Sequence, residues 1–278
     1  MAAADFEISE AVLVKYRGSG GNVTIPEGVE VIGEYAFADC GSLISVNIPE
    51  GVKVIGEFAF SDCRSLTSAN IPDGVEVIGK YAFTFCMSLA SADIPDSVKE
   101  IGKAAFSSCH SLFFVNIPGN VTEIGDLSFR DCRSLASVNI PSGVTRIESF
   151  AFERCASLAS VDIPDSVTRI GKSAFESCTS LASVNIPDSV RGIESSAFSG
   201  CGALASVSIS DDVLTDRLAP SPVKNFRTEL ASVFNGTPAL PALTKRYKQL
   251  MRDQERCWNC GSHAIGRFGK CKACKTRQ

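Results

Sequence analysis

The sequence holds few of the residues that usually carry acid–base or nucleophilic catalysis. Only two histidines, His110 and His263, occur in 278 residues. Serine is plentiful, but no serine stands in a distinct pattern with a base and an orienting acid. The stretch GSGG at 18–21 lacks the third glycine of a dinucleotide-binding loop, and no other stretch is suited to cradle a phosphate. We therefore expect no enzyme activity.

Long hydrophobic runs and a secretory signal are also missing. No window approaches the length of a membrane span, and MAAADFEISE lacks a basic segment followed by an apolar one. We expect a cytoplasmic location, with the nucleus as an alternative and no membrane contact. In a reducing compartment the twelve cysteines are expected to be thiols or metal ligands rather than disulfides.

Charge is distributed unevenly along the chain. The net charge is −4, but residues 242–278 hold ten Lys or Arg and two Asp or Glu, a balance of +8. The remaining 241 residues therefore carry −12. A basic tail on an acidic body predicts that the tail has a partner of its own.

What the sequence does contain is a repeat of 23 residues. SLASVNIPDSV at 180–190 returns as SLISVNIPEGV at 42, SLTSANIPDGV at 65, SLASVNIPSGV at 134 and SLASVDIPDSV at 157. Proline recurs from 26 to 187, phenylalanine from 37 to 198 and cysteine from 40 to 201, each eight times and without drift. A fixed period of this length is typical of a solenoid, and the constant spacing predicts a stack without long inserted loops.

One coil can be derived from its residue pattern. Leu43, Val46 and Ile48 alternate with Ser45 and Asn47, which predicts a short strand with the apolar set pointing inward. Each coil has too many apolar side chains to bury alone, so neighbouring coils must complete the core.

The rest of the coil follows from the same copy. Pro49 lacks a backbone donor and ends the strand. Val52, Ile55 and Phe60 then return to the core, with the phenylalanines of successive coils forming rungs of one spine. Gly33 and its equivalents suggest a positive φ, although Glu148 and Glu194 occupy the same position.

The pattern LxxVxIPxxVxxIGxxAFxxC resembles the BspA-like, or Treponema pallidum-type, leucine-rich repeats over roughly residues 6–213. The resemblance implies a right-handed solenoid with a parallel β-sheet on its concave side, and protein or surface-ligand binding rather than catalysis. We divide the chain into an N-terminal cap (1–24), the repeats (25–213), a closing cap and linker (214–241), a basic helix (242–256) and a cysteine-rich tail (257–278).

The tail carries two closely spaced cysteine pairs, Cys257 with Cys260 and Cys271 with Cys274. Two such pairs can present four sulfurs to one tetrahedral Zn²⁺, so we predict a zinc site. The alternatives are incidental cysteines, or redox chemistry at a single C-x-x-C, which would need a βαβ context that is absent here.

CWNCGSHAIGRFGKCKACKTRQ is similar to the first half of a MYND-type zinc finger, which implies a protein-interaction module. The sequence stops at Gln278, before the further ligands of that family. Either the natural chain continues, or the four cysteines share a single zinc.

Two groups of repeated side chains are candidates for partner binding. The first is the outward column of Asn and Asp side chains, with Phe114 as an apolar anchor in the neighbouring serine column. The alternative is that this face has no partner, and that its amides only contact water and hydrogen-bond one another. The candidates are Asn47, Asn70, Asp93, Phe114, Asn116, Asn139, Asp162 and Asn185. The second group, Tyr35, Phe58 and Tyr81, forms either a convex aromatic patch or, as we expect, packing between coils. The column of eight repeat cysteines is interpreted as small buried apolar residues.

These observations predict a non-enzymatic scaffold that binds proteins through the solenoid surface and the zinc tail. The alternative is a nucleic-acid-associated protein in which the basic tail contacts phosphates and Trp258 contacts a base.

Overall fold

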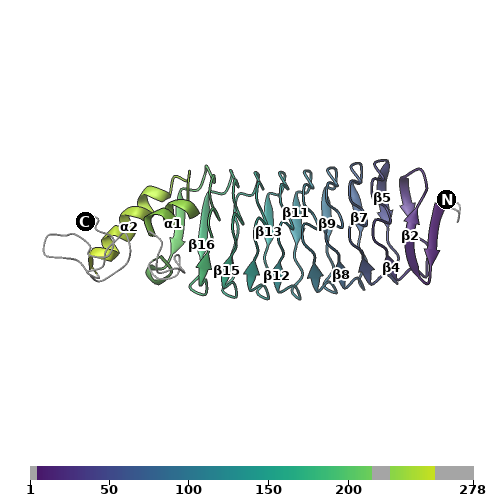
Figure 1. The fold of residues 1–278 in the computed structure, drawn as a ribbon, viewed down its shortest axis with the longest axis horizontal. Helices are drawn as coiled ribbons and strands as arrows, with labels where there is room; N and C mark the ends of the chain where they lie inside the picture. Colours follow the sequence, from purple (N-terminus) through teal and green to yellow (C-terminus); the bar gives the residue numbers. More distant parts are fainter. Residues whose placement is uncertain (1–4, 215–225, 254–278) are drawn as a thin grey trace.

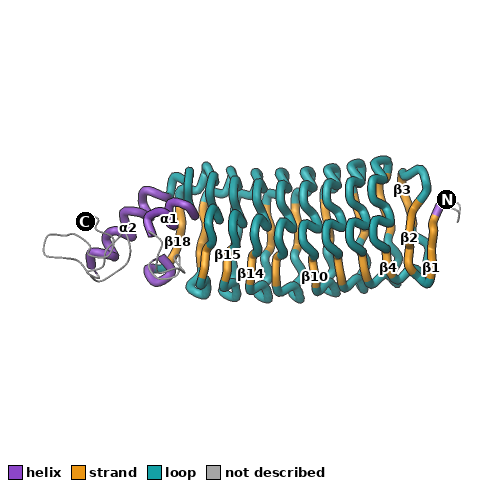
Figure 2. The backbone as a smooth tube through the Cα atoms, viewed as in Figure 1, coloured by secondary structure: helices purple, strands orange, loops and turns teal. Residues whose placement is uncertain are grey.

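The chain forms one elongated stack of coils. The computed structural model describes residues 5–214 and 226–253. Coils follow one another from the N-terminal strands to the C-terminal helices (Figure 1), and each coil has strand segments on two sides joined by loops (Figure 2). The prediction of a parallel β-solenoid is confirmed.

The first side of the stack carries the longer strands, which pair in parallel at a register of 23 residues, for example Val46 with Ala69. They form a six-stranded sheet and, beyond a gap at residues 160–162, a two-stranded sheet. The strands are β3 (Gly21–Thr24), β5 (Leu43–Asn47), β7 (Ser68–Asn70), β9 (Ser91–Asp93), β11 (Phe114–Asn116) and β13 (Ser137–Asn139), followed by β16 (Ser183–Ile186) and β18 (Ser206–Ile209).

The second side carries mostly two-residue strands, in a six-stranded and a four-stranded sheet. The six-stranded sheet contains β1 (Phe6–Ser9), β2 (Val12–Tyr16), β4 (Val31–Ile32), β6 (Val54–Ile55), β8 (Val77–Ile78) and β10 (Glu100–Ile101). The four-stranded sheet contains β12 (Glu123–Ile124), β14 (Arg146–Ile147), β15 (Arg169–Ile170) and β17 (Gly192–Ile193). The third side is a turn in which each coil donates three backbone bonds to the next, as from Tyr35, Phe37 and Asp39 to residues 57, 59 and 61.

The core is built as the repeat pattern predicts. Leu43, Val46 and Ile48 are buried and Asn47 is exposed, because the strand alternates between core and solvent. The eight repeat phenylalanines are completely buried and stacked, with neighbouring ring centroids 4.8 to 5.6 Å apart. Phe37, Phe60 and Phe83 thus form the expected rungs of a single spine.

The positive-φ interpretation of the repeated glycines is wrong. Gly33 and its equivalents have no positive φ; they permit close approach, since a Cβ on Gly56 would lie 2.7 Å from the carbonyl oxygen of Ile32. The left-handed positions come two residues later and hold side chains, as at Tyr35 (φ 54°) and Phe58 (φ 53°). Spacing alone cannot separate these two uses of glycine.

Both ends of the spine are closed by non-repeat segments. At the N-terminus β1 and β2 form an antiparallel hairpin, and Tyr16 stacks on Phe37 with 4.9 Å between ring centroids. At the C-terminus are helices α1 (Phe226–Val233) and α2 (Leu240–Asp253). Phe234, just after α1, stacks on Phe198 at 5.5 Å.

The C-terminal segment also completes the backbone pattern of the turn side. The amides of Ser196, Phe198 and Gly200 donate to the carbonyls of residues 232, 233 and 235. These residues therefore accept the three bonds that every earlier coil donates to its successor. Leu243 and Tyr247 of α2 are buried as well, so this helix packs on the stack through its apolar face.

Candidate functional site

The predicted partner-binding residues lie together on the first side of the stack. Asn47, Asn70, Asp93, Asn139, Asp162 and Asn185 are exposed and Asn116 is half-buried. Some of the amides bond along the stack, with Nδ2 of Asn70 3.3 Å from Oδ1 of Asn47 and Nδ2 of Asn139 3.1 Å from Oδ1 of Asn116. The face is therefore both solvated and internally hydrogen-bonded, and partner binding by these residues stays a prediction.

Two adjacent phenylalanines interrupt this polar face. Phe113 is 62% exposed and Phe114 is 45% exposed. Phe114 stands between Ser91 and Ser137 in the sheet register. Both rings are therefore flanked by small side chains, since the residues equivalent to Phe113 in the neighbouring coils are alanines 90 and 136. We name Phe113 and Phe114 the aromatic pair.

Phe113 was not among the sequence-predicted residues, although a signal for it exists. Its repeat position holds Ile, Thr, Ala, Phe, Ala, Ala, Ala and Ala from residue 44 to 205. Phe113 is the single ring in that column, just as Phe114 is in the serine column. Comparing every column for its one departure would have found both.

The repeat cysteines are free thiols; Cys40 is half-buried and the seven from Cys63 to Cys201 are buried. From Cys63 to Cys201 each thiol donates to the carbonyl of a phenylalanine 26 residues earlier, at 3.1 to 3.2 Å between sulfur and oxygen. Burial raises the pKa of these thiols, to about 12 for Cys201 and well above the ordinary value for Cys109. They are structural, as predicted, because a neutral buried thiol is a poor nucleophile and a poor metal ligand.

A second feature interrupts the other side of the stack. At each other junction between repeat coils on that side, two backbone bonds join neighbours, such as Lys99 to Glu76 and Gly102 to Ile78. The equivalent bonds from Thr122 and Gly125 to the preceding coil are missing, and β10 does not pair with β12. We name this junction the seam.

Charge explains where the seam lies. Had β10 and β12 paired, Glu100 and Glu123 would face each other directly, and like charges opposite one another destabilise a sheet. The equivalent residues of the three earlier coils are valines 31, 54 and 77, which pair without charge. The phenylalanine spacing is also widest here, at 5.6 Å between Phe106 and Phe129.

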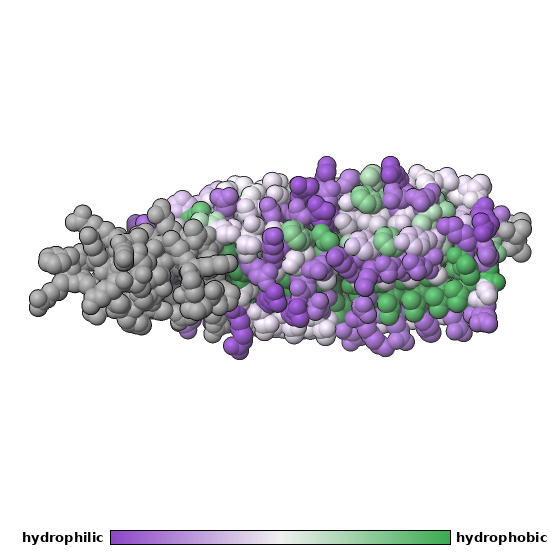
Figure 3. Space-filling model, in the orientation of Figure 1, coloured by the Kyte–Doolittle hydropathy of each residue, from purple (hydrophilic) through white to green (hydrophobic). Residues whose placement is uncertain are grey.

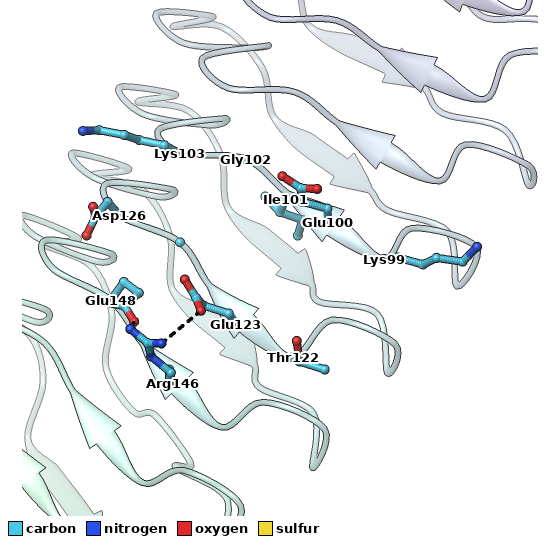
Figure 4. Close-up of a pocket in the computed structure, with 11 residues that line it drawn as sticks. Lys99, Glu100, Ile101, Gly102, Lys103, Thr122, Glu123, Asp126, Arg146 and Glu148 are labelled. Carbon is cyan, nitrogen blue, oxygen red and sulfur yellow. Dashed lines mark ion pairs between the residues drawn. The ribbon is translucent and has the colours of Figure 1, made fainter.

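A groove of about 620 Å³ opens at the seam (Figure 4). Lys99, Glu100, Lys103, Asp126 and neighbouring residues line it. Arg146 lies between Glu123, at 3.8 Å, and Glu148, and pairs with both. The charges of Arg146, Glu123 and Glu148 are thus paired with one another, which suits a structural junction better than a catalytic site.

Near the seam, the outward residues of the second side change from apolar to charged. Val31, Val54 and Val77 are half-buried, whereas Glu100, Glu123, Arg146 and Arg169 take their place further along. An apolar band follows the N-terminal half of the stack near β4 and β8 and gives way to hydrophilic residues (Figure 3).

The predicted zinc ligands Cys257, Cys260, Cys271 and Cys274 lie outside the described residues. Within 5–214 and 226–253, no group of three or more His, Cys, Asp or Glu side chains could hold a metal ion. No helix in those two ranges is long and apolar enough to cross a membrane.

The stacked coils, the phenylalanine spine and the column of buried thiols match a known repeat. The family model for the BspA type leucine-rich repeat region, with six copies, matches residues 15–136 and 99–216. The chain belongs to this family. Among solved structures, the chain is similar to a Treponema pallidum leucine-rich repeat protein, with 35% identity and a TM-score of 0.60. That match covers 65% of this chain and 90% of the T. pallidum chain.

Two further solved structures are similar to this BspA-type chain. A leucine-rich repeat protein from Bacteroides ovatus is 26% identical, with a TM-score of 0.39, over 72% of this chain and 76% of that one. A leucine-rich cell surface protein from Faecalibacterium prausnitzii is 26% identical, with a TM-score of 0.35, over 75% of this chain and 86% of that one. No curated protein matches the sequence. The comparisons support the BspA-type repeats and give no match to a zinc finger.

Proposed function

We propose that the protein is a non-enzymatic scaffold that binds other proteins in the cytoplasm or nucleus, with the aromatic pair as the centre of its interface. Leucine-rich repeat proteins generally mediate protein–protein interaction. In this proposal the face of β3 to β13 is the concave side of a right-handed superhelix. The observation that carries the proposal is the exposure of Phe113 and Phe114 on a sheet face that is otherwise mainly Ser, Asn, Asp and Ala, with Ile44 as another large apolar side chain exposed there.

The aromatic pair can contribute more binding free energy than the polar residues around it. Burying a large apolar side chain in an interface contributes ~1.5–3 kcal/mol, whereas exposed Asn and Ser side chains exchange water for partner contacts with little net gain. Two adjacent rings can therefore supply most of the affinity while the surrounding amides form the polar rim. Exposed aromatic rings that have no partner lower the solubility of a protein. Their presence on this face therefore favours a role in binding.

The experiment is capture of partners from lysate with the double variant Phe113→Ala/Phe114→Ser. This change copies the next coil, which has Ala136 and Ser137 at the same positions, so the fold should be retained. We expect partners held by the native chain to be lost, with unchanged circular dichroism. The control is Ile44→Ala, which removes another exposed apolar side chain (48% exposed) from the column of Phe113. Equal capture by the native chain and the double variant would contradict the proposal.

We propose further that Cys257, Cys260, Cys271 and Cys274 bind one Zn²⁺ and that this tail docks a second protein. Support comes from the paired cysteine spacing alone. Metal analysis of the purified chain should give one equivalent of zinc, and Cys257→Ser/Cys260→Ser should reduce it to none. A native chain without zinc after reconstitution under reducing conditions would contradict the site.

The +8 balance of residues 242–278 keeps nucleic-acid association as the alternative function. It predicts binding to mixed DNA or RNA that weakens steeply with salt, because phosphate contacts release counterions. Lack of such binding at low salt removes this alternative and leaves the protein-docking role.

A further inference from the structure

A groove of about 450 Å³ runs along the turn side of the first five coils, away from the sheet face of the aromatic pair. One wall begins with Tyr35, Phe58 and Tyr81, which we name the aromatic ladder. Its rings are parallel, with centroids 4.8 Å apart between Tyr35 and Phe58 and 4.7 Å apart between Phe58 and Tyr81. The expected packing of these rings between coils is confirmed by their stacking, and Tyr35 is still 45% exposed.

The opposite wall and the floor come from the residues that follow in each turn. Asp39, Asp62, Phe85 and Ser108 line the second wall, and Phe85 is 43% exposed. The floor consists of small polar residues, Ser61, Thr84 and Ser107, all buried. The groove is therefore a channel with aromatic groups on both walls and hydroxyl groups at its base.

The groove ends where the floor residue becomes large. Arg130 takes the position of Ser107 in the next coil, and its Nε lies 2.6 Å from Oε2 of Glu153. From Tyr35 to the coil of Arg130 is four coil spacings, roughly 19 Å at ~4.8 Å for each spacing. At ~3.3 Å for each residue, this length matches about six residues of extended chain.

The rings of both walls stand on backbone that disfavours them. Tyr35, Phe58 and Tyr81 have φ between 53° and 56°, and Phe85 has φ 59°. Bulky residues rarely adopt this left-handed conformation, and the same repeat positions hold Ser173 (φ 54°) and Ser177 (φ 60°) in a later coil. Serine is thus sufficient for the fold, so the aromatic choice in the first coils adds something that folding does not require.

Charge distinguishes the N-terminal end of the groove. Asp39 and Asp62 lie in its wall, and Glu34 and Glu57 stand immediately before ladder residues in the sequence. Arg64 pairs with Asp62 at 2.9 Å, and Nζ of Lys15 lies 2.8 Å from the carbonyl oxygen of Tyr35, which leaves this end with two more carboxylates than cations. Toward the other end the same repeat position holds Lys80, Lys103 and then Asp126. The groove thus combines an acidic end with exposed rings.

We propose that this groove binds an extended segment of a partner protein that carries Lys or Arg at one end and an aromatic side chain three to four residues away. The cation meets Asp39 and Asp62, and the ring packs against Tyr81 and Phe85. A cation also contacts a ring of this column within the chain, since Nζ of Lys172 lies 5.8 Å from the ring centroid of Phe150. The polar floor satisfies backbone groups of the segment.

The test is fluorescence anisotropy with the full chain and labelled hexapeptides. The probe is Arg-Arg-Ser-Phe-Ser-Phe, together with its reversed sequence because the groove does not fix chain direction. Glu-Glu-Ser-Phe-Ser-Phe removes the charge match, and Arg-Arg-Ser-Ser-Ser-Ser removes the rings. We expect one of the first two peptides to bind saturably and both control peptides to bind roughly tenfold more weakly.

Variants then locate the site. Tyr81→Ser and Phe85→Ser introduce the residue that later coils hold at the same positions, at Ser173 and Ser177, so folding is expected to survive. Each variant should bind the probe peptide roughly tenfold more weakly than the native chain does. The control Phe150→Ser removes a ring from the same column outside the groove and should leave binding unchanged.

Two results would overturn the proposal: equal affinity for the arginine and glutamate peptides, or an equal loss with Phe150→Ser and Tyr81→Ser. Phe113→Ala/Phe114→Ser separates this proposal from the proposed function. If that variant abolishes peptide binding, the peptide occupies the sheet face and the groove proposal is wrong, while the scaffold proposal stands.

Discussion

At the scale of single residues, the buried thiols make the same packing contact and the same hydrogen bond at successive coils of the stack. Each thiol is small enough for the crowded turn behind the phenylalanine spine, and its sulfur donates to a carbonyl of the preceding coil. Serine could make the same bond, but its hydroxyl is more costly to bury than a thiol. Cysteine therefore joins apolar packing with a weak hydrogen bond.

These thiols predict an alkaline loss of stability. Burial raises the pKa of Cys86, Cys109 and Cys155 far above the value of ~8.5 in an unfolded chain. The stability they contribute is complete below that unfolded pKa and is lost as pH rises, because only the unfolded chain releases the protons. By pH 10 the loss is roughly 2 kcal/mol for each thiol.

Urea denaturation at pH 7.5 and pH 10 measures this effect. The triple variant Cys86→Ala/Cys109→Ala/Cys155→Ala should be less stable than the native chain at pH 7.5, because cavities form. Its free energy of unfolding should fall less than that of the native chain between pH 7.5 and pH 10. The same loss in both proteins would show that other groups govern alkaline unfolding.

At the scale of elements, the seam shows that a regular repeat need not give a continuous sheet. Glu100 and Glu123 occupy a position that valine fills in the three earlier coils. Their strands β10 and β12 do not pair with each other, although each pairs with its other neighbour. Further along, Arg146 and Arg169 do pair strand to strand, because Glu123, Glu148 and Glu194 neutralise them. Charge pattern therefore decides pairing where the backbone pattern is constant.

Glu100→Lys should close the seam. Placing opposite charges across from each other favours the pair by ~0.2–1 kcal/mol and removes a repulsion. We expect slower hydrogen exchange at the amides of Thr122 and Gly125, with a smaller effect for Glu100→Gln, which removes the repulsion without adding attraction. Unchanged exchange at both amides in both variants would mean that charge does not hold the seam open.

At the scale of the whole molecule, the stack depends on its two ends. An interior coil has neighbours on both sides, but the last coil would expose Phe198 and three backbone donors without residues 232–235. The C-terminal segment supplies the ring of Phe234 and three carbonyl groups. It therefore ends the solenoid by providing the same contacts that a further coil would provide.

Phe234→Ala should unfold the stack from its C-terminal end. Phe-to-Ala changes in a core cost about 3–5 kcal/mol, and nearest-neighbour coupling directs the effect to the coils beside the change. Hydrogen exchange should increase first in β16 to β18, while β5 to β9 keep their protection. Equal loss along the whole stack would instead show that all the coils unfold as one unit.

Much of the architecture could be predicted because the same residue pattern occurs in eight successive copies. The inward set at Leu43, Val46 and Ile48 and the phenylalanine spine follow from periodicity. The candidate interface was predicted only in part, since Phe114 breaks a serine column but Phe113 stands in a more variable one. Deviations from a repeat, rather than its consensus, mark the places where one coil differs in function.

The sequence by itself determined the period, the buried residues and the spine, because each coil can bury its apolar side chains only against copies of itself. The tertiary structure decided what depends on neighbouring coils: that the repeated glycines serve close approach, that the second sheet opens between Glu100 and Glu123, and that the aromatic ladder borders a groove. Each of these depends on the distance and charge between residues 23 positions apart, and those become neighbours only after the coils stack.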